Sequence, residues 1–200
     1  MTDRAVPAPT LRDAIAAADR RLEAATPAAP APAADSAAAA SRRFVLFTVA
    51  ATHYAVPEAA VTELERVPRI TPVPHVPEWL RGVSNLRGDI VSVVDLRMYL
   101  GLSPHLPATA RLLVVRLLDE PFTTGLIVDA VGRIVTLQAD EVKTPASPLE
   151  GPLAPYLTGV CTVGDRLVAV LDIDRLLRSP DIRQFEDPRS TESGASAAIH

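Results

Sequence analysis

An internal repeat is the feature of this sequence that most constrains its fold. Residues 82–100 match residues 159–177 at a constant offset of 77, with no gap. Gly82 returns as Gly159, and the apolar run after each glycine keeps the same spacing. Two units of this size bury more apolar surface when they pack on one another than either buries alone. The repeat therefore predicts a body of two related halves, and the seam between the halves is a natural place for a partner.

The beginnings of the two copies match at a second offset, of 70 residues. The matching residues are Val56, Val61 and Leu64 in the first copy and Leu126, Val131 and Ile134 in the second. Because the two offsets differ by seven residues, one loop between strands must be longer in the second copy. The repeated body covers residues 44–180, which is enough chain to bury on the order of two thirds of its unfolded surface.

Short apolar segments separated by turn residues indicate about five strands in each copy. The expected strands of the first copy are 44–49, 54–56, one ending near 64, and two within 82–94 around a turn at 85–88. Those of the second copy are 111–118, 124–128, 134–137, 159–163 and 167–171, and short helices follow at 95–100 and 172–178. Four prolines between positions 68 and 77 predict an ordered surface loop, anchored by Trp79 and Leu80. This pattern predicts a mainly β protein of two small barrels side by side.

The segments outside the body have a different composition. Residues 11–25 predict a short helix behind Thr10, with a thin apolar stripe, and residues 26–41 form an Ala/Pro-rich linker. Extended, this linker would reach roughly 50 Å. The arm of residues 1–43 is either a tethered helix that docks on a partner or on the body, or a solvated tail with transient helicity. Residues 181–200 predict a polar, flexible tail.

Charge and apolar content exclude several classes of protein. The body has 12 Lys plus Arg and 15 Asp plus Glu, whereas nucleic-acid binders concentrate positive charge. With no apolar stretch of 18 residues and no apolar signal core after Met1, we expect a cytoplasmic protein without membrane insertion. The single cysteine, Cys161, cannot form an internal disulfide, which fits a reducing compartment.

The residues that most resemble catalytic groups have simpler explanations. Asp95 and Asp172 occupy matching positions and could form a shared-proton dyad, but each precedes a helical turn, where aspartate commonly caps. The four histidines, at positions 53, 75, 105 and 200, show no metal-ligand spacing, and surface placement explains them. His53 falls in a predicted hairpin turn. We therefore predict no catalytic residue, no cofactor and no metal.

The turn at residues 85–88 distinguishes the two copies. The first copy has Asn85-Leu86-Arg87-Gly88, whereas the second has Thr162-Val163-Gly164-Asp165. Arg87 therefore has no counterpart that the shared fold requires. A guanidinium suits either a carboxylate on a partner or internal bracing, and the residues alone leave both open.

The stretch from Gly82 to Gly88, with the apolar strand that runs to Asp95 behind it, resembles the CheW-like adaptor domains of bacterial chemotaxis. Further similarity lies at residues 44–64, 125–131 and 156–177. The resemblance covers nearly the whole body. It implies two five-stranded SH3-like barrels in a pseudo-twofold relation, in agreement with the repeat.

The resemblance also implies a function. It indicates a non-enzymatic scaffold that couples methyl-accepting receptors to a CheA-type histidine kinase, whose regulatory domain has the same fold. Receptor tips would lie along the groove between the barrels, in cytoplasmic receptor arrays, and kinase contacts would come mainly from the second barrel. The receptor-contact residues carried over by motif are Val61, Glu63, Leu64, Asn85, Leu86, Arg87 and Gly88.

Other functions remain as alternatives. The long Ala/Pro arm is unusual for a minimal adaptor and fits an accessory CheW-like regulator of a system such as type IV pili or gliding. Such a regulator would act on the kinase without receptor contact. A small-barrel nucleic-acid binder and a carboxylate-based hydrolase are remote alternatives, the former weakened by an aromatic content of 4%.

Overall fold

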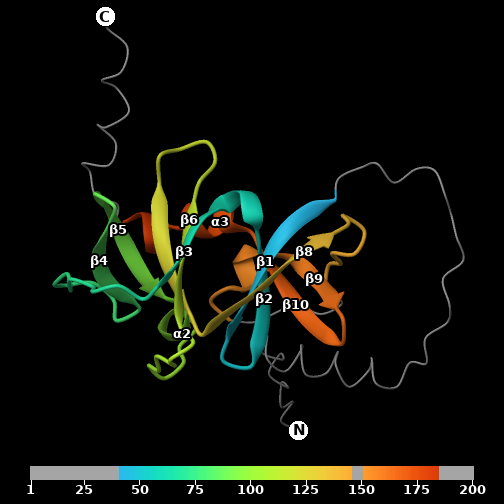
Figure 1. Ribbon diagram of the computed structural model, residues 1–200, viewed down its shortest axis with the longest axis horizontal. Coiled ribbons are helices and arrows are strands. Elements are labelled where there is room, and N and C mark those ends of the chain that lie inside the picture. Colours follow the sequence, from blue (N-terminus) through green and yellow to red (C-terminus); the bar gives the residue numbers. More distant parts are fainter. Residues whose placement is uncertain (1–40, 146–150, 185–200) are drawn as a thin grey trace, which may run out of the picture.

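A computed structural model describes residues 41–145 and 151–184 (Figure 1). Its strands are β1 Arg42–Val49, β2 Thr52–Pro57, β3 Val61–Arg66, β4 Leu80–Leu86, β5 Asp89–Asp95, β6 Arg111–Arg116, β7 Thr123–Val128, β8 Ala130–Leu137, β9 Leu157–Val163 and β10 Arg166–Leu171. Its short helices are η1 Glu58–Ala60, α2 Leu96–Tyr99, η2 Ala154–Tyr156, α3 Ile173–Leu177 and α4 Pro180–Arg183. The predicted strands and helical turns of the body are thus present. The predicted helix at 11–25 and nearly all of the linker lie outside the described residues.

The strands form two five-stranded sheets that lie side by side in Figure 1. One has the order β8-β1-β2-β10-β9 and the other the order β3-β6-β7-β5-β4. Replacing each strand by its counterpart in the other copy (β1 by β6, β2 by β7, and so on) converts one strand order into the other. The sequence repeat is therefore also a structural repeat. Each sheet also contains one parallel pair, β10 with β2 and β5 with β7. The mainly β, pseudo-twofold architecture predicted from the sequence is confirmed.

Neither sheet corresponds to one copy of the repeat. The first sheet combines β1 and β2 of the first copy with β8, β9 and β10 of the second. The chain changes sheet between β2 and β3, where Pro57 ends β2 and the single turn η1 follows. Two modules that each fold from one copy are therefore the wrong description, because strands are shared between the copies.

Three apolar clusters hold the sheets together. The largest lies between the sheets and includes Phe47, Tyr54, Leu113 and Leu126. Two smaller clusters lie on the opposite face of each sheet, one around Val168 in the first sheet and one around Leu112 in the second. Both faces of the central strands are thus buried, which explains why burial along β2 and β7 does not alternate from one residue to the next. Burial raises the pKa of Tyr54 to about 12.

The repeated glycines allow a loop to cross each edge strand closely. Thr71, in the proline-rich segment after β3, exchanges two backbone hydrogen bonds with Val83 of β4, of 2.8 and 2.9 Å. A Cβ on Gly82 would lie 2.1 Å from the Thr71 carbonyl oxygen. Lys143 forms the equivalent bridge across β9, and a Cβ on Gly159 would lie 2.7 Å from its carbonyl oxygen. The chain that follows one edge strand therefore meets the opposite edge strand, so each sheet curls into a partly closed barrel.

Trp79 anchors the end of the proline-rich loop, as predicted. Its ring meets Tyr99 of α2 edge-on, with centroids 5.2 Å apart. Leu80 is buried in the core between the sheets. Burial, together with Tyr156 and Asp181, raises the pKa of the Tyr99 hydroxyl well above its ordinary value. The loop is therefore held at the seam by aromatic packing.

Asp129 fastens the two sheets to each other at the connection between β7 and β8. Its Oδ2 accepts a hydrogen bond from the Ala50 N–H at 2.7 Å, in the β1–β2 turn of the first sheet. The same oxygen accepts from Arg97 of α2 at 2.6 Å, beside the second sheet. Both side chains are mostly buried, at 16% exposed for Arg97 and 15% for Asp129. The Asp129 carboxylate thus accepts hydrogen bonds from both sides of the boundary between the sheets.

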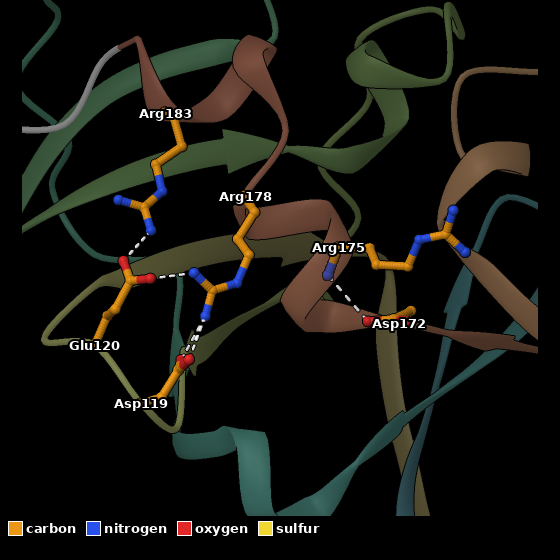
Figure 2. Close-up of polar contacts among 6 residues, drawn as sticks. All are labelled: Asp119, Glu120, Asp172, Arg175, Arg178 and Arg183. Carbon is orange, nitrogen blue, oxygen red and sulfur yellow. Dashed lines mark hydrogen bonds and ion pairs between the residues drawn. The ribbon is translucent and has the colours of Figure 1, made fainter.

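The C-terminal end of the described chain differs from the prediction. Residues 180–183 form helix α4, whereas we expected a flexible tail from residue 181. Figure 2 shows the reason, because Arg178 forms two hydrogen bonds of 2.5 and 2.6 Å with Asp119 and pairs with Glu120 in the β6–β7 loop. Glu120 also pairs with Arg183, and the two arginines lower the pKa of Glu120 below its ordinary value of 4.5. The ordered body therefore extends through α4.

Candidate functional site

The turn between β4 and β5 builds the centre of the predicted receptor site. Its two central residues, Arg87 and Gly88, have φ angles of 55° and 108°. Tight hairpins favour such positive φ values because these angles match the twist of the flanking strands. The Asn85 side-chain oxygen accepts a hydrogen bond of 2.8 Å from the Gly88 N–H. Asn85 and Gly88 therefore shape the turn, and Arg87 lies at its tip.

Strand β3, at the edge of the same sheet, places carboxylates beside this turn. Arg87 Nη1 lies 3.2 Å from Glu63 Oε1, and its Nη2 lies 3.8 Å from Glu65 Oε1. The structure thus brings together Glu63 and Arg87, as the resemblance implied. Glu65 was missed, although its place two residues after Glu63 on a strand puts it on the same face.

The other predicted residues take different places. Leu64 lies on the opposite face of β3 from the two glutamates and is 50% exposed. Val61 is half-buried and packs against the core between the sheets. Leu86 is buried in the apolar cluster of its own sheet. The seven predicted residues therefore lie close along β3 and the turn, but the Leu86 side chain supports the turn from inside.

The ion pairs of Arg87 contribute little to the stability of the fold. Its side chain is 75% exposed, and ion pairs at such positions contribute about 0–1 kcal/mol. A left-handed backbone at a residue with a Cβ costs roughly 1–2 kcal/mol. The two internal ion pairs are similar in size to that cost, so the net contribution of Arg87 to stability is small. A positively charged, exposed tip is what this position provides.

One oxygen of Glu63 is left without a partner. Its Oε2 atom is buried, and no group among the described residues donates a hydrogen bond to it. Buried acceptors without a donor are costly, so Glu63 is held here at some cost to stability. Its other oxygen, Oε1, faces Arg87 and helps to orient the guanidinium.

The aspartates proposed as a dyad are helix caps. Asp95 Oδ1 accepts from the N–H groups of Arg97 and Met98 at 3.0 and 3.3 Å, at the start of α2. Asp172 accepts from the Arg175 N–H at 2.9 Å, at the start of α3 (Figure 2). The capping interpretation is confirmed at both positions.

His53 and Cys161 also have definite places. His53 lies in β2 and is half-buried, so its prediction as a turn residue is wrong; the turn is formed by the two alanines before β2. Cys161 is buried on β9, and burial raises the pKa of its thiol. Within residues 41–145 and 151–184, no three His, Cys, Asp or Glu side chains gather as metal ligands would.

Residues 43–181 match the family model described as CheW-like domain. The chain belongs to the CheW-like family. It is 30% identical over 142 residues to the chemotaxis protein CheW of Klebsiella aerogenes, which covers 70% of this chain and 84% of that protein. It is 30% identical over 143 residues to the chemotaxis protein CheW of Rhizobium meliloti, covering 70% and 90% of the two chains. The matched region coincides with the two sheets.

The solved structures agree with this membership. The scaffolding protein TtCheW from Thermoanaerobacter tengcongensis is 25% identical and superposes with a TM-score of 0.62, covering 71% of this chain and 96% of that one. This CheW-like chain is therefore a chemotaxis adaptor of the scaffold type. The helices in its described part are all too short to cross a membrane.

Proposed function

We propose that this CheW-like adaptor couples methyl-accepting receptors to a CheA-type histidine kinase without catalysing a reaction. The receptor tip contacts β3 and the β4–β5 turn. The observation that carries this proposal is the exposed Arg87 at the tip of a strained turn, beside Glu63 and Glu65. Family membership supports the class of partner, and the geometry supports the surface.

The charged and apolar residues of this surface have different tasks. Arg87 donates to carboxylates or carbonyls of the receptor, and Glu63 and Glu65 orient its guanidinium. Exposed Leu64 and half-buried Val61 supply apolar contact area. Charges at the rim of an interface mainly set orientation and the rate of association, whereas buried apolar contacts supply affinity. The adaptor works in the cytoplasm at receptor arrays, and its other contacts are made to the regulatory domain of the kinase.

The variant Arg87→Glu tests the receptor contact. We expect it to lose co-sedimentation with receptor-containing membranes, because it places a carboxylate beside Glu63 and Glu65. Its thermal unfolding should change little, since the ion pairs lie at an exposed tip. Arg175→Glu is the matched control, because Arg175 is exposed on α3 and its side chain points away from the ion pairs in Figure 2. Unaltered co-sedimentation of a folded Arg87→Glu protein would reject the contact, and an unfolded one would favour bracing.

A second function is an accessory regulator that acts on the kinase without touching receptors. The chain is also 37% identical over 116 residues to Protein PilI of Pseudomonas aeruginosa. This match covers 57% of the chain and 64% of that protein. Kinase assays with and without receptor separate the two functions. An effect of the adaptor on phosphorylation that is the same without receptor supports the regulator.

A further inference from the structure

The first sheet has an open mouth at one end, whereas the equivalent end of the second sheet is filled. A cavity of about 510 Å³ lies where the end of β1, the start of β2, the start of β8 and the β9–β10 turn meet. Its apolar floor includes Leu46, Val163 and Val168, which also belong to or pack on the apolar cluster of this sheet. The volume is in the range of sites that take small molecules or single side chains.

The pseudo-twofold relation identifies the counterpart of this mouth. In the second sheet, Leu86 fills the interior beneath the turn, and Arg87 reaches across from the turn to Glu63 on the edge strand β3. At the matching positions of the first sheet, valine replaces the leucine at 163 and glycine replaces the arginine at 164. The mouth of the first sheet, beside the β9–β10 turn, is therefore open. At the equivalent end of the second sheet, Leu86 fills the interior and Arg87 bridges to β3.

The charge of the open mouth is opposite to that of its counterpart. Arg133 on β8 stands at the position of Glu63, and Arg166 stands at the position of Asp89. The Arg133 guanidinium has no ion-pair partner among the residues that the structure describes. In the described part of the chain, Arg166 has one ion-pair partner, the exposed Asp165, which lies 3.9 Å away and also lines the cavity. Two exposed guanidinium groups thus flank an apolar hollow, an arrangement that complements an acidic segment with an apolar residue between its carboxylates.

The backbone at this mouth is also available. β8 is an edge strand, which pairs with β1 on one side only within the two described sheets. Its residues Gly132, Arg133 and Ile134 are exposed. An edge strand next to an apolar groove is a surface to which an extended peptide can add.

We propose that this mouth is a second docking site, which takes an extended acidic segment of a partner protein. An apolar side chain of the segment enters the cavity, and its flanking carboxylates bind Arg133 and Arg166. The backbone of the segment pairs with β8. This site is distinct from the β3 and β4–β5 surface and does not depend on the proposed receptor contact.

The test uses the full chain and a defined probe, the peptide acetyl-Gly-Ser-Glu-Leu-Glu-Ser-Gly-amide. Amide chemical shifts of the isotope-labelled protein are followed while the peptide is added. We expect saturable shifts at Gly132 and Gly164. The same peptide with lysine at both glutamate positions should give none. Arg133→Glu should weaken binding about tenfold, and Val163→Phe, which narrows the cavity with the charges unchanged, should also weaken it.

Several results would overturn the proposal. They are shifts that do not saturate, equal binding of the lysine peptide, and unchanged binding by a folded Arg133→Glu or Val163→Phe protein. Shifts confined to residues 61–65 and 85–88 would place the peptide at the other surface. If Arg133→Glu changes the amide shifts of residues 1–40 in the absence of peptide, the occupant is the chain's own N-terminal arm, and the proposal for a partner segment fails.

Discussion

The close crossing of the loop over Gly82 can be tested by adding one methyl group. In Gly82→Ala, the new Cβ would lie 2.1 Å from the Thr71 carbonyl oxygen, a distance that no relaxed structure accepts. The loop must move away, and both backbone hydrogen bonds between Thr71 and Val83 are then lost. Two such bonds contribute about 1–3 kcal/mol in total. The φ angle of 129° at Gly82 adds a backbone cost of roughly 1–2 kcal/mol for alanine. We therefore expect Gly82→Ala to lower the free energy of unfolding by about 2–5 kcal/mol.

Two other glycines separate these contributions. Gly88 has a φ angle of 108° but open space where a Cβ would lie, so Gly88→Ala should cost only the backbone part, roughly 1–2 kcal/mol. Gly159 has no left-handed backbone, but its Cβ would lie 2.7 Å from the Lys143 carbonyl oxygen. Gly159→Ala should therefore cost only the bridge between Lys143 and Val160, about 1–3 kcal/mol. The loss in Gly82→Ala should approach the sum of the other two.

The assay is urea unfolding of the three variants, followed by far-ultraviolet circular dichroism. Hydrogen exchange adds a local readout, because the amide of Val83 should lose protection in Gly82→Ala and keep it in Gly88→Ala. If Gly82→Ala is no less stable than Gly88→Ala, the crossing contributes nothing and the reasoning is wrong. A loss of protection spread over the whole sheet would likewise show that the loop is not a local clasp.

Three further predictions concern charged side chains. Asp129→Ala should lower the free energy of unfolding, measured in urea, by about 2–4 kcal/mol, because it leaves the mostly buried Arg97 unpaired. In an Arg97→Met background most of that loss should disappear. A loss that persists in this background would contradict the pairing. Asp95→Ala should destabilise more than Asp172→Ala, because Asp95 caps two N–H groups and Asp172 caps one; thermal unfolding that reverses this order would contradict it. The pKa of Glu120 is lowered in the folded state, so the ionised side chain stabilises the fold above pH 4.5, and this stabilisation is lost as the pH falls through the lowered pKa. The difference in melting temperature between the unaltered protein and Glu120→Gln should therefore vanish on acidification. A difference that stays constant with pH would argue against the ion pairs.

The repeat carried most of the fold prediction. The offsets of 77 and 70 related the two copies, and short apolar segments between turn residues placed the strands of the body within a few residues, because these signals act locally. The longer loop of the second copy lies between Leu137 and Leu157, and it corresponds to the shorter stretch between Arg66 and Leu80 in the first copy. Capping by Asp95 and Asp172 was also readable, since it depends on the next few residues only.

Contacts between distant segments could not be read in the same way. The sharing of strands between sheets depends on which strands pair, and apolar patterns do not encode pairing. Helix α4 is held by Glu120, which lies about 60 residues earlier, so its own polar composition gave the impression of a tail. Leu86 was counted as a contact residue because the motif names it, whereas its side chain direction depends on the register of the hairpin.

The sharing of strands has a consequence for synthesis of the chain. The second sheet is a continuous piece, from Val61 to Val128, and can assemble as soon as it leaves the ribosome. The first sheet cannot, because β1 and β2 emerge early and β10 begins only at Arg166. At usual rates of translation, on the order of 5–20 s pass before these early strands meet their last neighbours. During that interval the nascent chain exposes the apolar faces of β1 and β2, which makes this end of the protein the part most exposed to aggregation and to chaperones.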